Sequence, residues 1–291
     1  MERKGSGAES ASTFVGRRGA LMVMVGAALM AAMVTLSAAG YRNSSLERIP
    51  VVEVVAHRAG AALGPENTVA ALEQSIAAGV GWAEIDVQMT ADGVAVVLHD
   101  GSLERTTGLR ANVWQTDMKT MKQLDAGGWY SPAFAGERLA TLEEMAAAAR
   151  GRIRLMVEVK SDGPYARLLL EHTVTQIQTL GQTEEWTLAS ADANLLSRSK
   201  QLRPELSTLL IGVALPEDMQ QPDVDGYSIQ LYGLTAQTVA QAKALDKKVY
   251  AWTVNTPQEI QRALALGVDG LVTDQPVLTR QLAQAAGYMV R

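Results

Sequence analysis

Residues 51–291 predict an α/β fold, a (β/α)8 barrel of parallel strands, because short β-branched or apolar runs alternate with helical segments. Repeated strand-then-helix units of this length indicate a parallel sheet that is either doubly wound or closed into a barrel. The number of candidate strands favours the barrel. No glycine-rich dinucleotide motif or phosphate-binding loop follows any strand, so a nucleotide cofactor has no support. The candidate strands are residues 51–56, 82–89, 94–99, 155–159, 186–189, 208–211, 227–229, 248–254 and 270–272.

The segments between these strands carry helix-start signals. Thr141 and Glu144 form a capping box, and Thr256 is followed by Pro257 at the first helical position. Only residues 90–93 join the second and third candidate strands. This turn is too short for a crossover helix, so we expect an irregular connection there.

Composition narrows the class of protein. A chain of 291 residues with 47% hydrophobic and 20% charged residues can bury a core, and a barrel of this length forms one domain. The formal net charge of -5, without a basic block, argues against nucleic acid as the main partner. The chain has 0 cysteines, which excludes disulfides, thiolate zinc sites and a cysteine nucleophile.

An apolar segment precedes the predicted barrel. Residues 19–40 are uncharged and long enough to span a bilayer as a helix. Residues 1–18 form a basic segment that ends in Arg17 and Arg18, which predicts a cytoplasmic N-terminus. Residues 41–50 then form a short linker to the barrel domain.

This segment predicts a membrane-anchored protein whose catalytic domain lies outside the cytoplasm, in the periplasm or the extracellular space. The alternative is a secreted protein, because Ser37, Ala38 and Ala39 form a small-residue cleavage site near Ala39. A buried N-terminal helix of the globular domain is the weaker interpretation, since the run is apolar on all sides. The Arg17 and Arg18 pair is a weak match to a twin-arginine signal.

Three carboxylates fall in places where barrel enzymes carry their active sites, at the carboxyl ends of strands. Glu84 and Asp86 are separated by one residue, so both project to the same face of an extended strand. The same spacing aligns Glu158 with Lys160. Each acid alone is more often a surface or ion-paired residue, but three such acids at one mouth need a cation. Because the ligands are carboxylate oxygens and the chain has no cysteine, they predict one hard divalent cation, Mg2+ or Ca2+.

Two of the three histidines, His57 and His99, lie at strand ends next to a charged residue. Cleavage of a phosphodiester requires one group that removes a proton from the nucleophile and another that protonates the leaving alkoxide. Two imidazoles can do both near neutral pH. A single histidine of this kind is a structural residue as often as a catalytic one. The third histidine, His172, lies in a helical stretch and receives no role.

Three further residues are candidates for substrate binding. Arg58 and Lys160 are placed to bind phosphate oxygens, or to pair with the carboxylates and hold the shape of the site. Trp252 lies at a late strand end and is expected to form an apolar wall for the alcohol portion of the substrate. Core packing is the equally weighted alternative for Trp252.

These residues, in this order, resemble the glycerophosphodiester phosphodiesterase family, which is related to the phosphatidylinositol-specific phospholipases C. The similarity covers roughly residues 51–286, and its combined motifs are specific although each piece alone is weak. They are His57-Arg58-Ala59-Gly60, Pro65-Glu66-Asn67-Thr68, Glu84-Ile85-Asp86-Val87, Thr90-Ala91-Asp92-Gly93, His99-Asp100, Arg105-Thr106-Thr107, Gly136-Glu137, Thr141-Leu142-Glu143-Glu144, Glu158-Val159-Lys160 and Thr273-Asp274-Gln275-Pro276.

The resemblance implies a TIM barrel, a divalent metal and hydrolysis of glycerophosphodiesters to sn-glycerol 3-phosphate and an alcohol. By position it implies two acid-base histidines, three metal-binding carboxylates and two phosphate-contacting cations: His57 and His99; Glu84, Asp86 and Glu158; Arg58 and Lys160. The sequence departs from the family at Ala59, where glycine is common, which puts the pose of Arg58 in doubt.

Two competing functions stay open. A lysophospholipase D or sphingomyelinase-D-like activity on membrane lysolipids uses a similar set of two histidines and metal-binding carboxylates, and a membrane anchor favours it. A catalytically inactive barrel that serves as a binding protein is the alternative from another class. The sequence leaves open the headgroup preference, Mg2+ against Ca2+, the oligomeric state and which histidine is the base.

Overall fold

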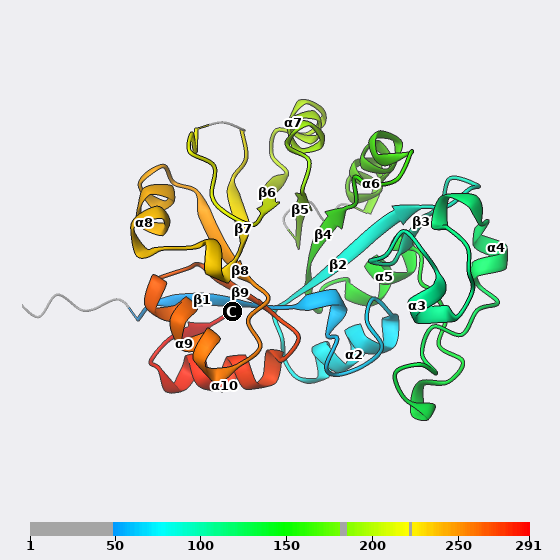
Figure 1. The fold of residues 1–291 in the computed structure, drawn as a ribbon, viewed down its shortest axis with the longest axis horizontal. Helices are drawn as coiled ribbons and strands as arrows, with labels where there is room; N and C mark the ends of the chain where they lie inside the picture. Colours follow the sequence, from blue (N-terminus) through cyan, green and yellow to red (C-terminus); the bar gives the residue numbers. More distant parts are fainter. Residues whose placement is uncertain (1–48, 181–184, 221–222) are drawn as a thin grey trace, which may run out of the picture. The chain divides into compact units, whose positions relative to one another are not determined.

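The computed structural model describes residues 49–180, 185–220 and 223–291 of the chain (Figure 1). The predicted N-terminal segments 1–18 and 19–40, and the linker up to residue 48, lie outside the described residues. Within the described part of the chain, no helix is both long and apolar enough to cross a membrane.

The described residues form a closed barrel of parallel strands, as predicted. β1 pairs with both β2 and β9, which closes the sheet, and the order around it is β1, β9, β8, β7, β6, β5, β4 and β2. The TIM-barrel prediction is therefore confirmed. The barrel strands are β1 (Val51–Ala56), β2 (Trp82–Met89), β4 (Arg154–Val159), β5 (Trp186–Ser190), β6 (Ser207–Gly212), β7 (Gly226–Gln230), β8 (Lys248–Trp252) and β9 (Gly270–Thr273).

Helices surround the barrel strands (Figure 1). Besides the connection after β2, described below, the one between β6 and β7 departs from strand-helix alternation: its described residues 213–220 and 223–225 contain no helix. A short strand, β10 (Met289–Val290), follows the last helix and adds to the edge of β1. The outer helices are α2 (Val69–Ala77), α5 (Leu142–Ala149), α6 (Ala166–Leu180), α7 (Ala193–Leu202), α8 (Ala236–Ala244), α9 (Pro257–Leu266) and α10 (Pro276–Ala285).

The predicted helix starts are present. The Thr141 hydroxyl accepts a hydrogen bond from the Glu144 backbone N–H, and the Glu144 side chain accepts one from the Thr141 N–H. Thr256 and Glu259 form the same reciprocal pair at the start of α9. These caps satisfy backbone donors that a helix leaves unpaired, so they fix where each helix begins.

The expected irregular connection follows β2. β3 (Ala95–Val97) turns back antiparallel to β2. It is shorter than the predicted strand 94–99, so His99 lies in the loop beyond it. β8 likewise ends at Trp252, where its ladder with β7 ends, and not at residue 254.

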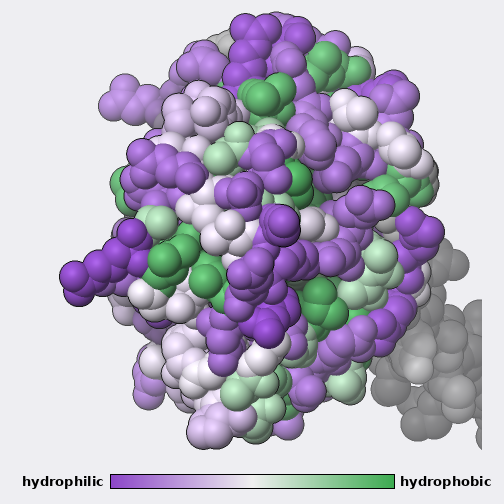
Figure 2. Space-filling view, turned by 90° about the vertical axis from the view of Figure 1, so that its right-hand side faces the viewer, coloured by the Kyte–Doolittle hydropathy of each residue, from purple (hydrophilic) through white to green (hydrophobic). Residues whose placement is uncertain are grey.

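Residues 98–140 then form a compact segment that includes α3 (Glu104–Thr107), α4 (Met118–Met121) and two short 3-10 helices, Val113–Gln115 and Pro132–Phe134, before α5. This segment has its own small apolar core, and the surface on this side of the domain is mostly hydrophilic, with small separate apolar patches (Figure 2). The segment fixes the loop that carries His99. Its core consists of Leu98, Leu103, Val113, Met118, Met121, Ala126 and Leu139, together with Val96 of β3.

The interior of the barrel places the polar residues at its mouth. Trp82 belongs to the apolar cluster inside the barrel, together with Met156 and Tyr250. Because side chains alternate along a strand, Glu84 and Asp86 follow Trp82 on the same inward face. The inward face of β2 therefore changes from apolar at its start to acidic at its carboxyl end.

Candidate active site

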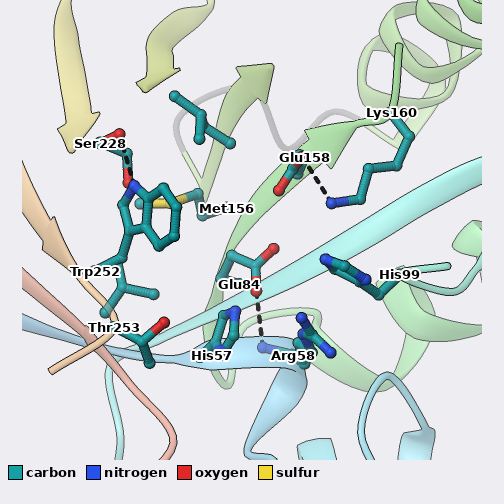
Figure 3. A pocket seen from close by; sticks show the side chains of 12 residues that line it. His57, Arg58, Glu84, His99, Met156, Glu158, Lys160, Ser228, Trp252 and Thr253 are labelled. Carbon is teal, nitrogen blue, oxygen red and sulfur yellow. Dashed lines mark hydrogen bonds and ion pairs between the residues drawn. The ribbon is translucent and has the colours of Figure 1, made fainter. Parts of the chain in front are cut away.

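The predicted site residues gather around one cavity of about 270 Å3 at the carboxyl ends of the barrel strands. Figure 3 shows their side chains converging from different strands and loops. Asp86 is the exception, because it lies beneath the cavity wall and is only 1% exposed. The predicted residues that line the cavity are His57, Arg58, Glu84, His99, Glu158, Lys160 and Trp252.

Three carboxylates form a compact group at the mouth. The ladder between β2 and β4 pairs Asp86 with Glu158. Ligand oxygens of Glu84, Asp86 and Glu158 all lie within 4.8 Å of one another. Glu84 Oε2 accepts a 2.7 Å hydrogen bond from the Arg58 backbone N–H, and Asp86 Oδ2 accepts one of 2.7 Å from Asn67 Nδ2. Glu84 Oε1 is buried and has no hydrogen-bond partner.

Crowding of these acids shifts their pKa values in different directions. Burial, followed by the charge of Asp86, raises the pKa of Glu84 to about 8. Burial acts in the same direction on Asp86, but Lys160 and His99 outweigh it and lower the Asp86 pKa to about 2. Burial and the charge of Asp86 raise the pKa of Glu158. A group of acids that resists full ionisation is suited to a positive ion that stabilises it.

The donor set fits a hard divalent cation. It offers carboxylate oxygens only, and the buried Glu84 Oε1 is an acceptor that no protein donor satisfies. Mg2+ and Ca2+ prefer such oxygen ligands, whereas structural zinc sites use cysteine and histidine. Glu84, Asp86 and Glu158 are the residues that would hold the ion.

Lys160 neutralises part of this acidic group. Its Nζ lies 2.7 Å from Asp86 Oδ1 and 2.7 Å from Glu158 Oε1. Burial lowers the pKa of Lys160, but the two carboxylates outweigh burial and raise it. The ammonium therefore stays charged at neutral pH, and its position on the cavity wall also allows contact with an anionic substrate.

His57 is oriented by a carboxylate from the far end of the chain. Its Nδ1 lies 2.7 Å from Asp274 Oδ1, and Asp274 Oδ2 accepts a 2.6 Å hydrogen bond from Asn255 Nδ2. Burial lowers the pKa of His57, but the hydrogen bond to Asp274 and the charges of Glu84 and Asp274 give a net rise. With Nδ1 engaged, Nε2 is the ring nitrogen left for the cavity.

His99 is oriented in a similar way on the opposite side of the carboxylates. Its Nδ1 lies 2.7 Å from Asp100 Oδ1, and Asp100 Oδ2 accepts a 2.7 Å hydrogen bond from Arg105 Nε. The hydrogen bond from Arg105 is the main reason that the pKa of Asp100 falls to about 2. Both histidines therefore have a carboxylate at Nδ1 that fixes the ring.

Arg58 contacts the site mainly through its backbone. It adopts a left-handed conformation with φ of 49°, and Ala59 follows with φ of 65°. This turn aims the Arg58 N–H at Glu84, while Arg58 Nη1 lies 2.8 Å from Glu66 Oε1. The Ala59 position that departs from the family thus adopts the backbone conformation that glycine favours. The expectation that the Arg58 guanidinium binds phosphate stays a prediction.

Trp252 forms part of the apolar wall of the cavity. Its Nε1 donates a 2.9 Å hydrogen bond to the Ser228 carbonyl, which fixes the indole (Figure 3). Met156, Ile211 and Val272 complete this wall. The cavity therefore has one charged side and one apolar side, as a phosphate attached to a carbon chain requires.

Sequence reasoning assigns no role to several polar residues that the structure places around the site. Asp274 and Asp100 hold the two histidines, Asn67 holds Asp86, and Glu66 joins Arg58 to Arg105. The available signal is position, because Asp274 directly follows β9 and all four acidic or amide residues lie within the motifs that carry the family resemblance.

Comparisons with known proteins agree with this geometry. The model of the glycerophosphoryl diester phosphodiesterase family matches residues 57–278. A glycerophosphodiester phosphodiesterase of Caldanaerobacter subterraneus subsp. tengcongensis is 30% identical over 240 residues, covering 80% of this chain and 98% of that protein. One from Bacillus altitudinis is 29% identical, covering 78% and 96%.

Solved structures agree as well. A phosphodiesterase of Oleispira antarctica, determined with the product sn-glycerol-3-phosphate, superimposes with a TM-score of 0.77 at 28% identity. The match covers 80% of this chain and 97% of that one. A glycerophosphodiester phosphodiesterase of Parabacteroides distasonis gives a TM-score of 0.70 at 25% identity, covering 82% and 100%.

A parallel barrel with histidines, acids and a lysine at its carboxyl-end mouth defines a barrel hydrolase of phosphoric diesters. The chain belongs to the glycerophosphoryl diester phosphodiesterase family.

Proposed function

We propose that the protein hydrolyses glycerophosphodiesters to sn-glycerol 3-phosphate and an alcohol with the help of one divalent cation, Mg2+ or Ca2+. The observation that carries the proposal is the placement of two carboxylate-oriented histidines, His57 and His99, on one cavity with Glu84, Glu158 and Lys160. The product bound by the relative from Oleispira antarctica supports glycerol phosphate as the recognised portion.

In the proposed reaction, one imidazole removes a proton from the attacking nucleophile, which forms the new P–O bond. The other imidazole donates a proton to the alcohol oxygen as its bond to phosphorus breaks. Asp274 and Asp100 hold the two rings through Nδ1, so that Nε2 carries each proton. Lys160 binds a phosphate oxygen and stabilises the developing negative charge.

Glu84, Asp86 and Glu158 hold the cation in this proposal, and the crowding of the buried Glu84 and Asp86 with the partly buried Glu158 supports the assignment. When bound, the cation supplies positive charge beside the phosphate oxygens. Arg58 and Trp252 complete the substrate site, Arg58 as a phosphate contact and Trp252 as the apolar wall.

A second candidate function is lysophospholipase D activity on membrane lysolipids. The apolar wall formed by Ile211 and Trp252 favours it, because Val213 and Tyr232, at the ends of the neighbouring strands β6 and β7, are 69% and 70% exposed. An acyl chain can follow such a surface out of the cavity.

One assay tests both candidates. The purified full chain is incubated with glycerophosphocholine and with lysophosphatidylcholine, with and without EDTA, and the released products are identified. We expect choline release from glycerophosphocholine that stops in EDTA and returns with Mg2+ or Ca2+. Release of choline from lysophosphatidylcholine alone would favour the second candidate. Full activity after verified metal removal would contradict the requirement for a divalent cation.

We also propose that residues 19–40 anchor the protein in a membrane, with the catalytic domain outside the cytoplasm. The support is the uncharged length of this segment and the arginines before it. Proteolysis of spheroplasts, in which no outer membrane shields the periplasm, is expected to digest the catalytic domain while cytoplasmic proteins survive. A protected domain contradicts this orientation, and recovery of a soluble, shortened chain from the exterior supports the secreted alternative.

A further inference from the structure

A second cavity of about 500 Å3 adjoins the first on the His99 side. His99, Glu158 and Lys160 line both cavities, so the two meet where the phosphate is proposed to bind. A diester has two groups on its phosphate. The two cavities therefore provide one compartment for each group.

The second cavity has a distinctive charge. Asp100 and Glu158 line it, but Asp100 pairs with Arg105 and Glu158 pairs with Lys160. Asp162 also lines it, and within the described residues this exposed carboxylate has neither an ion pair nor a hydrogen bond. A single negative charge is thus available to a ligand there.

Gly101 lets an aromatic ring approach the same place. A Cβ added at Gly101 would lie 2.8 Å from Trp114 Cζ3 and 3.6 Å from Asp162 Oδ2. The indole and the carboxylate therefore flank Gly101, which lines the cavity. Trp114 packs behind Gly101 and does not line the cavity, so the Asp162 carboxylate attracts an ammonium group there through its charge.

We infer that the second cavity binds the alcohol portion of the diester and that Asp162 selects alcohols carrying an ammonium group. This inference rests on the proposed function and names its substrate class. The glycerol portion has no charge, so an unpaired carboxylate gives it no advantage. Ethanolamine and choline headgroups carry the charge that Asp162 complements.

The test compares substrates that differ in headgroup charge. The kcat/KM of the full chain is measured for glycerophosphocholine, glycerophosphoethanolamine and the uncharged-headgroup substrate glycerophosphoglycerol. Asp162→Asn is expected to lower kcat/KM for the two ammonium substrates about three- to fivefold, the range of an exposed charge pair, and to leave glycerophosphoglycerol unchanged. Asp162→Lys is expected to lower kcat/KM about tenfold for the same two ammonium substrates, because charge repulsion replaces attraction.

Two control variants separate the effect of the Asp162 charge from other effects of substitution. Asp162→Glu retains the carboxylate and is expected to keep the preference. Asp223→Asn removes an exposed carboxylate just before β7, at the opposite end of the barrel. It is expected to leave the ratio of kcat/KM between ammonium and uncharged headgroups unchanged. Added 0.5 M NaCl, roughly enough to shorten the screening length below 5 Å, should weaken the preference of the wild type.

The outcomes separate the inference from the function on which it rests. Turnover of all three diesters with the same ratio in wild type and Asp162→Asn overturns the role of Asp162 while the proposed function stands. An equal loss for all three also overturns it, since selection requires a difference between headgroups. Absence of turnover for every diester in the wild type, with metal present, rejects the proposed function instead.

Discussion

His57 and Asp274 are joined by a 2.7 Å contact between Nδ1 and Oδ1, although 217 residues separate them in the chain. The pair exists because β1 and β9 are neighbours in the closed barrel, with Ala56 opposite Thr273. Each partner is the residue that directly follows its strand. Barrel closure thus sets the orientation of a proposed catalytic ring.

Asp274→Asn is expected to lower kcat about 10²-fold or more, because an amide no longer fixes the Nδ1-protonated form of His57. The bond from Asn255 to this side chain can persist, so the fold should survive. Two measurements check the prediction: steady-state kinetics, and 15N NMR of the His57 ring, which reports its tautomer. A large loss of kcat with an unchanged tautomer contradicts this explanation.

Lys160→Met is expected to destabilise the metal-free protein by roughly 3 to 5 kcal/mol, because it removes the cation that bridges the buried Asp86 and the partly buried Glu158 carboxylates. The rise in melting temperature on adding Mg2+ or Ca2+ should then exceed that of the wild type, since the ion supplies the missing charge. kcat should fall about 10²-fold if Lys160 contacts the phosphate.

Lys200 provides a matched control for this measurement. Its side chain is 15% exposed, against 13% for Lys160, and it pairs with Asp225 at 2.6 Å. Asp225 lies just before β7, away from the mouth. Lys200→Met should therefore lose stability but keep the wild-type response to the metal. Equal metal responses for both lysine variants and the wild type return Lys160 to a purely structural role.

Stability of the metal-free protein is expected to fall as the pH rises from about 4.5 to 8. The folded pKa of Glu84, about 8, lies above its usual value of 4.5, so folding favours the protonated form. This contribution is present below the unfolded pKa and is lost as pH rises through the folded pKa. Asp86, with a pKa lowered to about 2, acts in the opposite direction but only in a more acidic range.

Glu84→Gln tests this assignment, since an amide resembles the protonated acid. Urea unfolding in EDTA should show a flatter dependence on pH for this variant than for the wild type. The variant should also lose the stabilisation by added Mg2+ or Ca2+. An unchanged pH dependence would mean that another group carries it.

The two histidines are expected to respond differently to an activated leaving group. Alanine at His57 or His99 should lower turnover about 10² to 10⁴-fold on natural diesters while metal binding persists. A nitrophenyl ester leaves without protonation, so it should rescue only the variant that lacks the acid. His172→Ala is the control and should behave as wild type. Equal loss on both substrates, with weaker metal binding, would show that the histidines organise the site.

Local periodicity explains what the sequence could predict. The shared face of Glu84 and Asp86, the alignment of Glu158 with Lys160 and the capping boxes depend on neighbours within a few residues. The partner of His57 depends on the register between the first and last barrel strands, which no local pattern encodes.

The antiparallel turn after β2 shows an intermediate case. The short segment 90–93 excludes a crossover helix, and the structure confirms the irregular connection. The apolar core of residues 98–140, however, combines side chains from several short elements. Such short elements lack the periodicity from which packing can be inferred.

Pairing of β1 with β9 and β10 also has a consequence during protein synthesis. β1 ends at Ala56, and its partner β10 lies at Met289–Val290, close to the end of the chain. At about 5 to 20 residues per second, roughly 10 to 50 s pass between synthesis of the two strands. His57 has no Asp274 for most of that interval, so the nascent chain completes this pair only after β9 has been synthesised.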